Sequence, residues 1–364
     1  MLFNNPFVAS LTHRLKDRPE DVRGPYFRDQ TAIIHSLSFR RLKHKTQVFF
    51  SPENDHICTR LEHSLHVASI SATICKALGL DTELAQAIGL GHDLGHAPFG
   101  HAGEMALNRL IQRPFIHELH SLRVADLLEN YGKGLNLTYA VRDGIAAHCG
   151  EVDEQAIRVS DSPNPLRLPL IQRPPAPSTW EGCVVRISDS IAYLGRDLED
   201  AIKANLISIS DIPPAIRNRL GSRNSEIIDQ LVSDVIDWSE SNGRIGFSEP
   251  IFNTILQLKQ FSRDNIYQNP KMKYWNDYSN TVLSSIFHYL SELFDRLGVD
   301  FQAYQTSRAT LDQKFGHYIE ALRDVYAPVH YDRETILADY IAGMTDNFAQ
   351  RCFENILTAG TRGL

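Results

Sequence analysis

An apolar stripe along residues 181–203 constrains the fold of this chain more than any other feature of the sequence. Apolar side chains recur there at steps of three and four residues, at Ile187, Ile191, Leu194, Leu198 and Ile202. This spacing places side chains on one face of an α-helix. The same rhythm runs through residues 61–75, 82–94 and about 333–356, whereas the alternation typical of strands is hard to find. The sequence therefore predicts an all-α protein whose helices pack around one main core.

Local signals mark where several of these helices begin and end. Gly79 is predicted to end the first helix, and Thr82 is predicted to cap the next one. Residues 333–356 are predicted to form one helix. Six prolines between residues 163 and 177 exclude a regular helix from residues 160–178, which are predicted to form a surface loop or lid.

The charge of the chain limits its partners. A net charge of −7 over 364 residues excludes a surface built as a whole to attract polyanions, so a nucleic-acid role would need a local basic patch. Residues 38–47 are a candidate, with Arg40, Arg41, Lys43 and Lys45. Two interpretations stay open for this segment, the solvated face of a helix and a set of positive side chains that face phosphate.

The cysteines and the apolar segments indicate the compartment. Five scattered cysteines without a CxxC pair favour reduced thiols in the cytosol over disulfides or a cysteine-based zinc site. The first fourteen residues show no basic segment followed by an apolar stretch, so no signal peptide is visible. No apolar run reaches the roughly 18 residues that a membrane span needs. A cytoplasmic protein without membrane contact is expected.

Residues 91–104, GHDLGHAPFGHAGE, place three histidines and two carboxylates within fourteen positions. The adjacent His92 and Asp93 can present an imidazole and a carboxylate to one cation, and His63 and Asp189 can complete the set. Two imidazoles and two carboxylates suit one divalent ion per site, Mn or Mg first, with Ni, Fe, Co or Zn as alternatives. Taken singly, each histidine could be an ordinary hydrogen-bonded residue; the spaced set favours a metal-dependent hydrolase.

The glycines and Pro98 of the same segment end the helix after Leu94 and form a tight loop. This loop can return His96, His101 and Glu104 toward the cation. Glu104 lies three residues after His101, so the two side chains can meet on one helical turn and serve in proton transfer. The alternative is that Glu104 only stabilises the start of the next helix.

Two further polar residues share a helical face with Asp189. Tyr193 and Asp197 follow it at steps of four residues. Tyr193 could stack on a sugar or hydrogen-bond to it, and Asp197 could accept from a hydroxyl or a base. The alternative for Asp197 is an ordinary polar position on a helix.

Longer strings resemble the deoxyguanosinetriphosphate triphosphohydrolase-like family of HD-domain phosphohydrolases, in the order of that family. They are RDQTAIIHSLSFRRLKHKTQVF (28–49), TRLEHSLHVA (59–68), GHDLGHAPFGHAGE (91–104), GLNLTYAVRDGI (134–145), WEGCVVRISDSIAYLGRDLEDAI (180–202) and DYIAGMTDNFA (339–349). The resemblance implies hydrolysis of a dNTP, with dGTP one candidate, to deoxynucleoside and inorganic triphosphate. It implies a single unit over residues 1–364, with an HD core at about 55–205 and a helical region at about 206–364.

The resemblance also assigns roles residue by residue. It places metal ligands at His63, His92, Asp93 and Asp189, and catalytic groups at His101 and Glu104. The residues that it places at phosphate and sugar are Gln47, Arg60, His96, His117, Tyr193 and Asp197. It implies a homo-oligomer, with a dNTP or single-stranded DNA as effector. Departures from residues common in the family, at Ala147, Ser190, Gly195, Arg196 and Asn347, leave the preferred base and any effector response open.

Two other functions compete with this interpretation. An HD-type nucleotidase or phosphodiesterase would act on monophosphates or cyclic nucleotides, and would not need the histidines and arginine beyond the metal set. A catalytically silent nucleotide-binding or nucleic-acid-binding regulator would be expected to lack one of the catalytic residues, and none is missing.

Overall fold

The computed structural model describes residues 3–49, 57–149 and 153–359, and most of these residues are helical. The described residues include two strands of two residues each, β1 (Ala156–Ile157) and β2 (Ile245–Gly246), which pair with each other in antiparallel orientation. The predicted all-α class is confirmed. No helix in the described part of the chain is both long enough and apolar enough to cross a bilayer.

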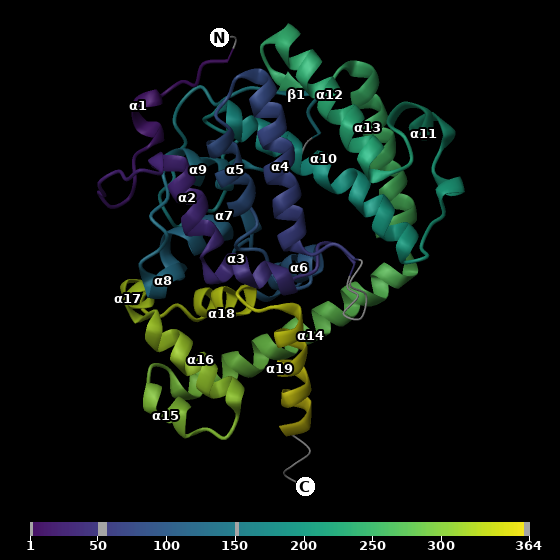
Figure 1. The fold of residues 1–364 in the computed structure, drawn as a ribbon. Helices are drawn as coiled ribbons and strands as arrows, with labels where there is room; N and C mark the ends of the chain where they lie inside the picture. The colour runs from purple at the N-terminus through teal and green to yellow at the C-terminus, as the bar shows by residue number, and fades with distance from the viewer. Residues whose placement is uncertain (1–2, 50–56, 150–152, 360–364) are drawn as a thin grey trace.

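Five helices that carry or flank the sequence motifs pack together in the upper body of Figure 1. They are α2 (Gly24–Ile34), α4 (Arg60–Leu78), α5 (Thr82–Gly91), α9 (Tyr139–Ala147) and α10 (Trp180–Lys203). Helix α4 lies against both α5 and α10, and α5 also contacts α2 and α9. The stripe predicted on α10 is buried, with Ile187, Ile191, Leu194 and Leu198 in the core.

Further helices surround this group. Helices α11 (Pro214–Leu220), α12 (Asn224–Asn242) and α13 (Glu249–Ser262) lie on the α10 side of the upper body (Figure 1). The bounds of the remaining helices of this part are α1 (Val8–Leu11), α3 (Leu37–Arg41), η1 (Leu42–His44), α6 (Gly100–Leu110), α7 (His117–Arg123), η2 (Val124–Leu128), α8 (Glu129–Gly132), η3 (Ile209–Asp211) and η4 (Arg263–Tyr267).

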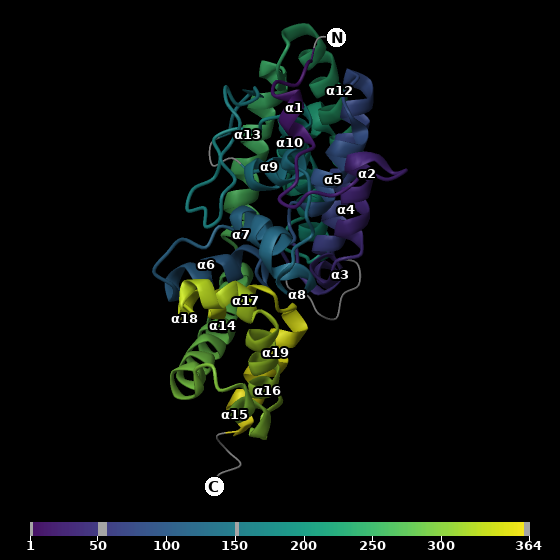
Figure 2. The same cartoon turned by 90° about the vertical axis from the view of Figure 1, so that its left-hand side faces the viewer.

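A second hydrophobic core lies in the lower body of the molecule, below the first in both views (Figures 1 and 2). Helix α14 (Pro270–Leu297) leads into it and packs along α6, so that Phe99, Leu107 and Phe115 belong to this second core. The other helices of the lower body are α15 (Phe301–Thr306), α16 (Thr310–Ala321), α17 (Arg323–Tyr326), η5 (Ala327–Val329), α18 (Arg333–Ala342) and α19 (Asp346–Ala359).

Helix boundaries follow the sequence in part. Gly79 ends α4 in a left-handed conformation with φ 70°, as predicted. Asp81, and not Thr82, caps α5, because its carboxylate accepts from the amides of Glu83 and Leu84. The single helix predicted for residues 333–356 is wrong: α18 ends at Ala342, and the Thr345 hydroxyl accepts from the amide of Phe348 to start α19.

The proline-rich segment 160–178 forms no helix or strand, as predicted. Buried hydrogen bonds fasten it to α9. The Asn164 amide donates to the Asp143 carboxylate at 2.7 Å, and Arg142 donates to the carbonyl of Leu166 at 3.0 Å. The structure therefore shows a partly buried surface loop that is anchored at these points.

In the basic segment 38–47, Lys45 neither lies on a solvated helix face nor faces a site for phosphate. This lysine is buried, and its ammonium donates to the carbonyls of His96 at 2.5 Å and Ala342 at 2.8 Å. The carboxylate of Asp346 accepts from the amide of Phe99 at 2.9 Å and from Thr46. The lower body thus holds the loop at residues 96–99, which belongs to the GHDLGHAPFGHAGE motif.

Asp339 on α18 forms a buried ion pair with Arg123 of α7, at 2.7 Å, and lies 3.2 Å from the ring of His120. Burial by itself would raise the pKa of Asp339, but Arg123 and His120 hold it well below its usual range. Removing one partner of a buried pair leaves an uncompensated charge. We therefore expect Asp339→Asn to lower the free energy of unfolding by about 3–5 kcal/mol at pH 7.

This loss should depend on pH. Because the pKa of Asp339 is lower in the folded state, its stabilisation is present above the unfolded value of about 4 and is lost as the pH falls toward the folded value. In urea unfolding between pH 7 and about 3.5, the difference between wild type and variant should shrink at the acid end. A matched control is Asp295→Asn, since the Asp295–Arg333 pair is solvent-exposed and should contribute under about 1 kcal/mol. A difference that stays constant with pH would contradict the assignment.

Candidate active site

A cavity of about 420 Å³ opens between α4, the start of α6, α10 and the start of α14. Of the twelve residues predicted for the site, all except His92 and Glu104 line it. Those that do are Gln47, Arg60, His63, Asp93, His96, His101, His117, Asp189, Tyr193 and Asp197. The fold therefore brings together residues from four separate stretches of the chain.

The four predicted metal ligands converge beside the cavity, and three of them, His63, Asp93 and Asp189, line it. His63 lies on α4 and Asp189 on α10, whereas His92 and Asp93 follow the end of α5 and are not within a helix, contrary to expectation. The Nε2 atom of His63 lies 2.9 Å from Oδ1 of Asp189. The Nε2 atom of His92 lies 3.5 Å from Asp93 and 3.9 Å from Asp189.

The orientation of His92 is that of a metal ligand. Its Nδ1 atom donates to the carbonyl of Gly89 at 2.7 Å, so Nε2 carries the lone pair. That atom is buried and has no hydrogen-bond partner among the described residues. Donor atoms of His63, His92 and Asp93 lie within 4.8 Å of one another. These residues fit a divalent cation held by two imidazoles and two carboxylates.

The protonation states suit the same ion. Burial lowers the pKa of His92 to about 4, which leaves its imidazole neutral. Burial would raise the pKa of Asp93, but the Arg60 guanidinium at 2.5 Å and the nearby histidines lower it well below its usual range. Burial would also raise the pKa of Asp189, but the hydrogen bond with His63 outweighs burial and lowers this pKa below its usual value. Both carboxylates are therefore ionised.

Imidazoles and one guanidinium form the adjoining wall. His96 is fully buried, and burial together with Arg60 lowers its pKa well below the usual range. Burial has the same effect on His117, but the carboxylates of Glu118 and Glu104 outweigh it and raise the pKa of His117 well above its usual value. The wall thus combines a neutral imidazole, His96, with two cationic groups, His117 and Arg60.

Glu104 contacts His117 more closely than it contacts His101. Its carboxylate accepts from the backbone amide of His117 at 2.9 Å and lies 3.0 Å from the ring Nδ1. The Nδ1 atom of His101 is 3.6 Å from Glu104, which is longer than a hydrogen bond. The side chain of His101 is 69% exposed at the mouth of the cavity. The structure therefore brings Glu104 between the two histidines.

Tyr193 and Asp197 line the other end of the cavity, where sequence reasoning missed a partner. The hydroxyl of Tyr267, on η4, donates to Asp197 at 2.5 Å. Burial raises the pKa of Asp197 to about 7. Met272 and Asn276 of α14 also line this end. No motif marks these three residues, because only packing brings η4 and α14 to α10.

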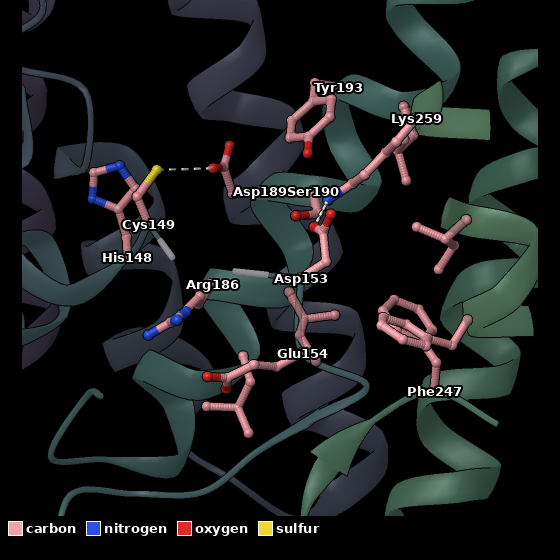
Figure 3. Close-up of a pocket in the computed structure, with 15 residues that line it drawn as sticks. His148, Cys149, Asp153, Glu154, Arg186, Asp189, Ser190, Tyr193, Phe247 and Lys259 are labelled. Atoms are coloured by element: carbon pink, nitrogen blue, oxygen red, sulfur yellow. Dashed lines mark hydrogen bonds and ion pairs between the residues drawn. The ribbon is translucent and has the colours of Figure 1, made fainter. Parts of the chain in front are cut away.

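A smaller cavity of about 110 Å³ adjoins the first behind Asp189 and Tyr193 (Figure 3). Lys259 pairs with Asp153 there, and its ammonium lies 5.8 Å from the centre of the Tyr193 ring. Ser190, one of the departures from the family pattern, lines the same space. His148 and Cys149 border both cavities and were not assigned by the sequence.

The fold and the site together define a class. A family model described as the HD domain matches residues 60–194, which contain all four predicted metal ligands. A second model, the phosphohydrolase-associated domain, matches residues 245–355, in the C-terminal part of the chain. The class is that of the HD-domain phosphohydrolases.

Relatives that match nearly the full length of the chain identify its family within this class of proteins. Proteins named deoxyguanosinetriphosphate triphosphohydrolase-like from Caldanaerobacter subterraneus subsp. tengcongensis and Desulfatibacillum aliphaticivorans are 39% and 38% identical to this chain, over 97% of it and over 91% and 94% of their own lengths. One of the same name from Clostridium tetani is 36% identical over 94% of this chain and 88% of its own. The chain belongs to this deoxyguanosinetriphosphate triphosphohydrolase-like family.

Proposed function

We propose that this protein is a metal-dependent dNTP triphosphohydrolase, which converts a dNTP and water into deoxynucleoside and inorganic triphosphate. One observation carries the proposal: a single cavity is lined by residues of a metal-type cluster, by the cationic and imidazole side chains of Arg60, His96 and His117, and by Tyr193 and Asp197. The names of the relatives support the same reaction.

Each wall would contribute one element of the chemistry. A divalent ion held by His63, His92, Asp93 and Asp189 would polarise a phosphate oxygen and lower the pKa of a bound water. Arg60, His96 and His117 would stabilise negative charge on the triphosphate as it leaves. All three side chains are buried, and donors held in place in this way before substrate binds would not need to be reorganised during the reaction.

The bond that breaks is P–O5′. Water attacks the α-phosphorus, its oxygen stays on the released triphosphate, and the leaving 5′-oxygen takes up a proton. His101 would supply this proton from the cavity mouth, where its ring is accessible. Glu104 would hold the neighbouring His117 in place, through both its backbone amide and its ring.

The sugar would lie against Tyr193 and Asp197, with Gln47 opposite. The Oε1 atom of Gln47 is buried without a hydrogen-bond partner among the described residues, as expected of a group that awaits a ligand. The Tyr267 hydroxyl would fix the carboxyl group of Asp197. A ring packed close to C2′ would exclude an added hydroxyl, so deoxynucleotides should be preferred.

The test is a panel of four dNTPs and four NTPs with Mn²⁺ or Mg²⁺, with products separated by chromatography. Intact triphosphate and deoxynucleoside are expected, and ¹⁸O from labelled water should appear in the triphosphate. kcat/KM should be at least about tenfold higher for each dNTP than for its NTP, and Tyr193→Ala should reduce this ratio while the metal content is unchanged. Release of orthophosphate or pyrophosphate, or equal use of both sugars, would reject the proposal.

A further inference from the structure

Asp346, the first residue of α19, contacts two segments of the chain that carry predicted site residues. Its Oδ2 atom accepts from the amide of Thr46 at 2.8 Å and from the hydroxyl of the same residue at 2.6 Å. Its Oδ1 atom accepts from the amide of Phe99 at 2.9 Å. Thr46 directly precedes Gln47, and Phe99 lies two residues before His101. A single side chain of the lower body therefore joins both segments.

These hydrogen bonds are enclosed by protein. Asp346 is only 4% exposed, and removing a buried acceptor leaves its donors unsatisfied, which costs more than the bonds themselves contribute. Lys45 adds a second connection, because its ammonium bridges the carbonyls of His96 and Ala342, the last residue of α18. The junction of α18 and α19, at the border of the two bodies, thus holds both segments (Figure 1).

The two segments lie in direct contact beside the cavity. A Cβ atom added at Gly100 would lie 2.8 Å from the carbonyl oxygen of Gln47, so no larger residue fits there without a shift. Phe99 has φ 63°, a left-handed conformation that a non-glycine residue keeps only where its surroundings hold it. The hydrogen bond from the Phe99 amide to Asp346 is one such restraint. Movement of Phe99 would therefore displace the start of α6, which carries His101, relative to Gln47.

We propose that Asp346 is a positioning residue, which fixes Gln47 and His101 relative to each other across the cavity. It does not line the cavity itself and would act through the backbone amides of Thr46 and Phe99. The inference rests on the proposed function in naming what Gln47 and His101 contact, the sugar and the leaving 5′-oxygen; the Asp346 hydrogen bonds need no nucleotide. A displacement of about 1 Å can cost about 100-fold in rate, so these bonds should matter for catalysis.

Hydrogen exchange of the full chain, without added nucleotide, tests the contacts directly, because two of the three donors are backbone amides. In Asp346→Ala, peptides that contain Thr46 or Phe99 should exchange at least about tenfold faster at these amides than in wild type, as expected where a buried hydrogen bond is lost. Asp346→Asn keeps one acceptor oxygen and should release only one of the two segments. Peptides from the middle of α10 should exchange as in wild type.

Steady-state kinetics of the same variants separate positioning from loss of folding. In Asp346→Ala, kcat/KM for dNTPs should fall by about 10–100-fold. The ratio of kcat/KM for each dNTP to that for its NTP should fall as well, because Gln47 would no longer be held opposite Tyr193. A smaller folded fraction would instead lower kcat equally with both sugars and leave KM unchanged. The metal content should equal that of wild type.

Asp312→Ala is the matched control. Asp312 lies on α16 of the lower body and is also 4% exposed, and its carboxylate accepts from the hydroxyls of Tyr289 and Ser307 at 2.7 Å each. It lies outside the cavity lining. This variant should lose stability to a similar degree, but its KM, its preference for deoxynucleotides and its exchange at Thr46 and Phe99 should match those of wild type.

Three results would overturn the proposal. Unchanged exchange at both Thr46 and Phe99 in Asp346→Ala would exclude the contacts. Faster exchange with an unchanged KM and sugar preference would exclude the positioning role, and so would kinetic losses equal to those of Asp312→Ala. Failure of the proposed function is distinguishable, because a wild type that hydrolyses no dNTP rejects that function, whereas exchange still decides whether Asp346 holds the two segments.

Discussion

Asp93→Ala is expected to lose the metal ion of the His63, His92, Asp93 and Asp189 site and, with it, hydrolysis. The carboxylate lies among His63, His92 and Arg60 with its pKa held low, so no neighbour can replace it. kcat should fall by more than the roughly 100–1000-fold that loss of one transition-state hydrogen-bond donor costs, since charge stabilisation and activation of water are lost together. Chelation of the wild type should give the same result. Elemental analysis and steady-state rates, taken on the same samples, check both statements.

Loss of folding must be separated from loss of metal, because Asp93→Ala also leaves the buried Arg60 without its partner. Asp126→Asn is the matched control. It breaks another buried pair, with Arg142 at 2.6 Å, outside the cavity. Both variants should be destabilised to a similar degree, by about 3–5 kcal/mol, but only Asp93→Ala should lose the metal. Activity that survives EDTA in protein that contains no stoichiometric metal would reject the site.

Glu104→Gln is expected to lower kcat by roughly two to four orders of magnitude, the range for groups that support proton transfer. His101→Ala should have an effect of the same order. Neither substitution removes one of the four predicted metal ligands, so the metal ion should remain bound. Glu83→Gln, on the exposed first turn of α5, is a matched control and should leave kcat within about twofold of wild type.

Double variants can identify the histidine with which Glu104 acts. Residues that work as one unit show losses far from additive. The distances from Glu104, 3.0 Å to His117 and 3.6 Å to His101, lead us to expect stronger coupling with His117. The pairing inferred from the three-residue spacing of His101 and Glu104 would be supported instead if only their double variant were no worse than the worse single one. Additive losses in both cycles would exclude any role for Glu104 through these rings.

The sequence by itself determined much of this protein. Apolar side chains at steps of three and four residues depend only on local geometry, and the helices that they predicted are present, α10 most clearly. The adjacency of His92 and Asp93, with the longer motifs, indicated the family without any tertiary information. The homo-oligomer, the effector and the single unit over residues 1–364 stay predictions.

Only the tertiary structure decided which side chains meet. No spacing pattern relates Asp197 to Tyr267, or Lys45 to Ala342, because helix packing brings these residues together over 70 or more positions of the chain. The same holds for Glu104, which the sequence paired with His101 and the fold places against His117. Local periodicity determines where helices form and which face is apolar, whereas the contacts of polar groups in the cavity depend on how those helices pack.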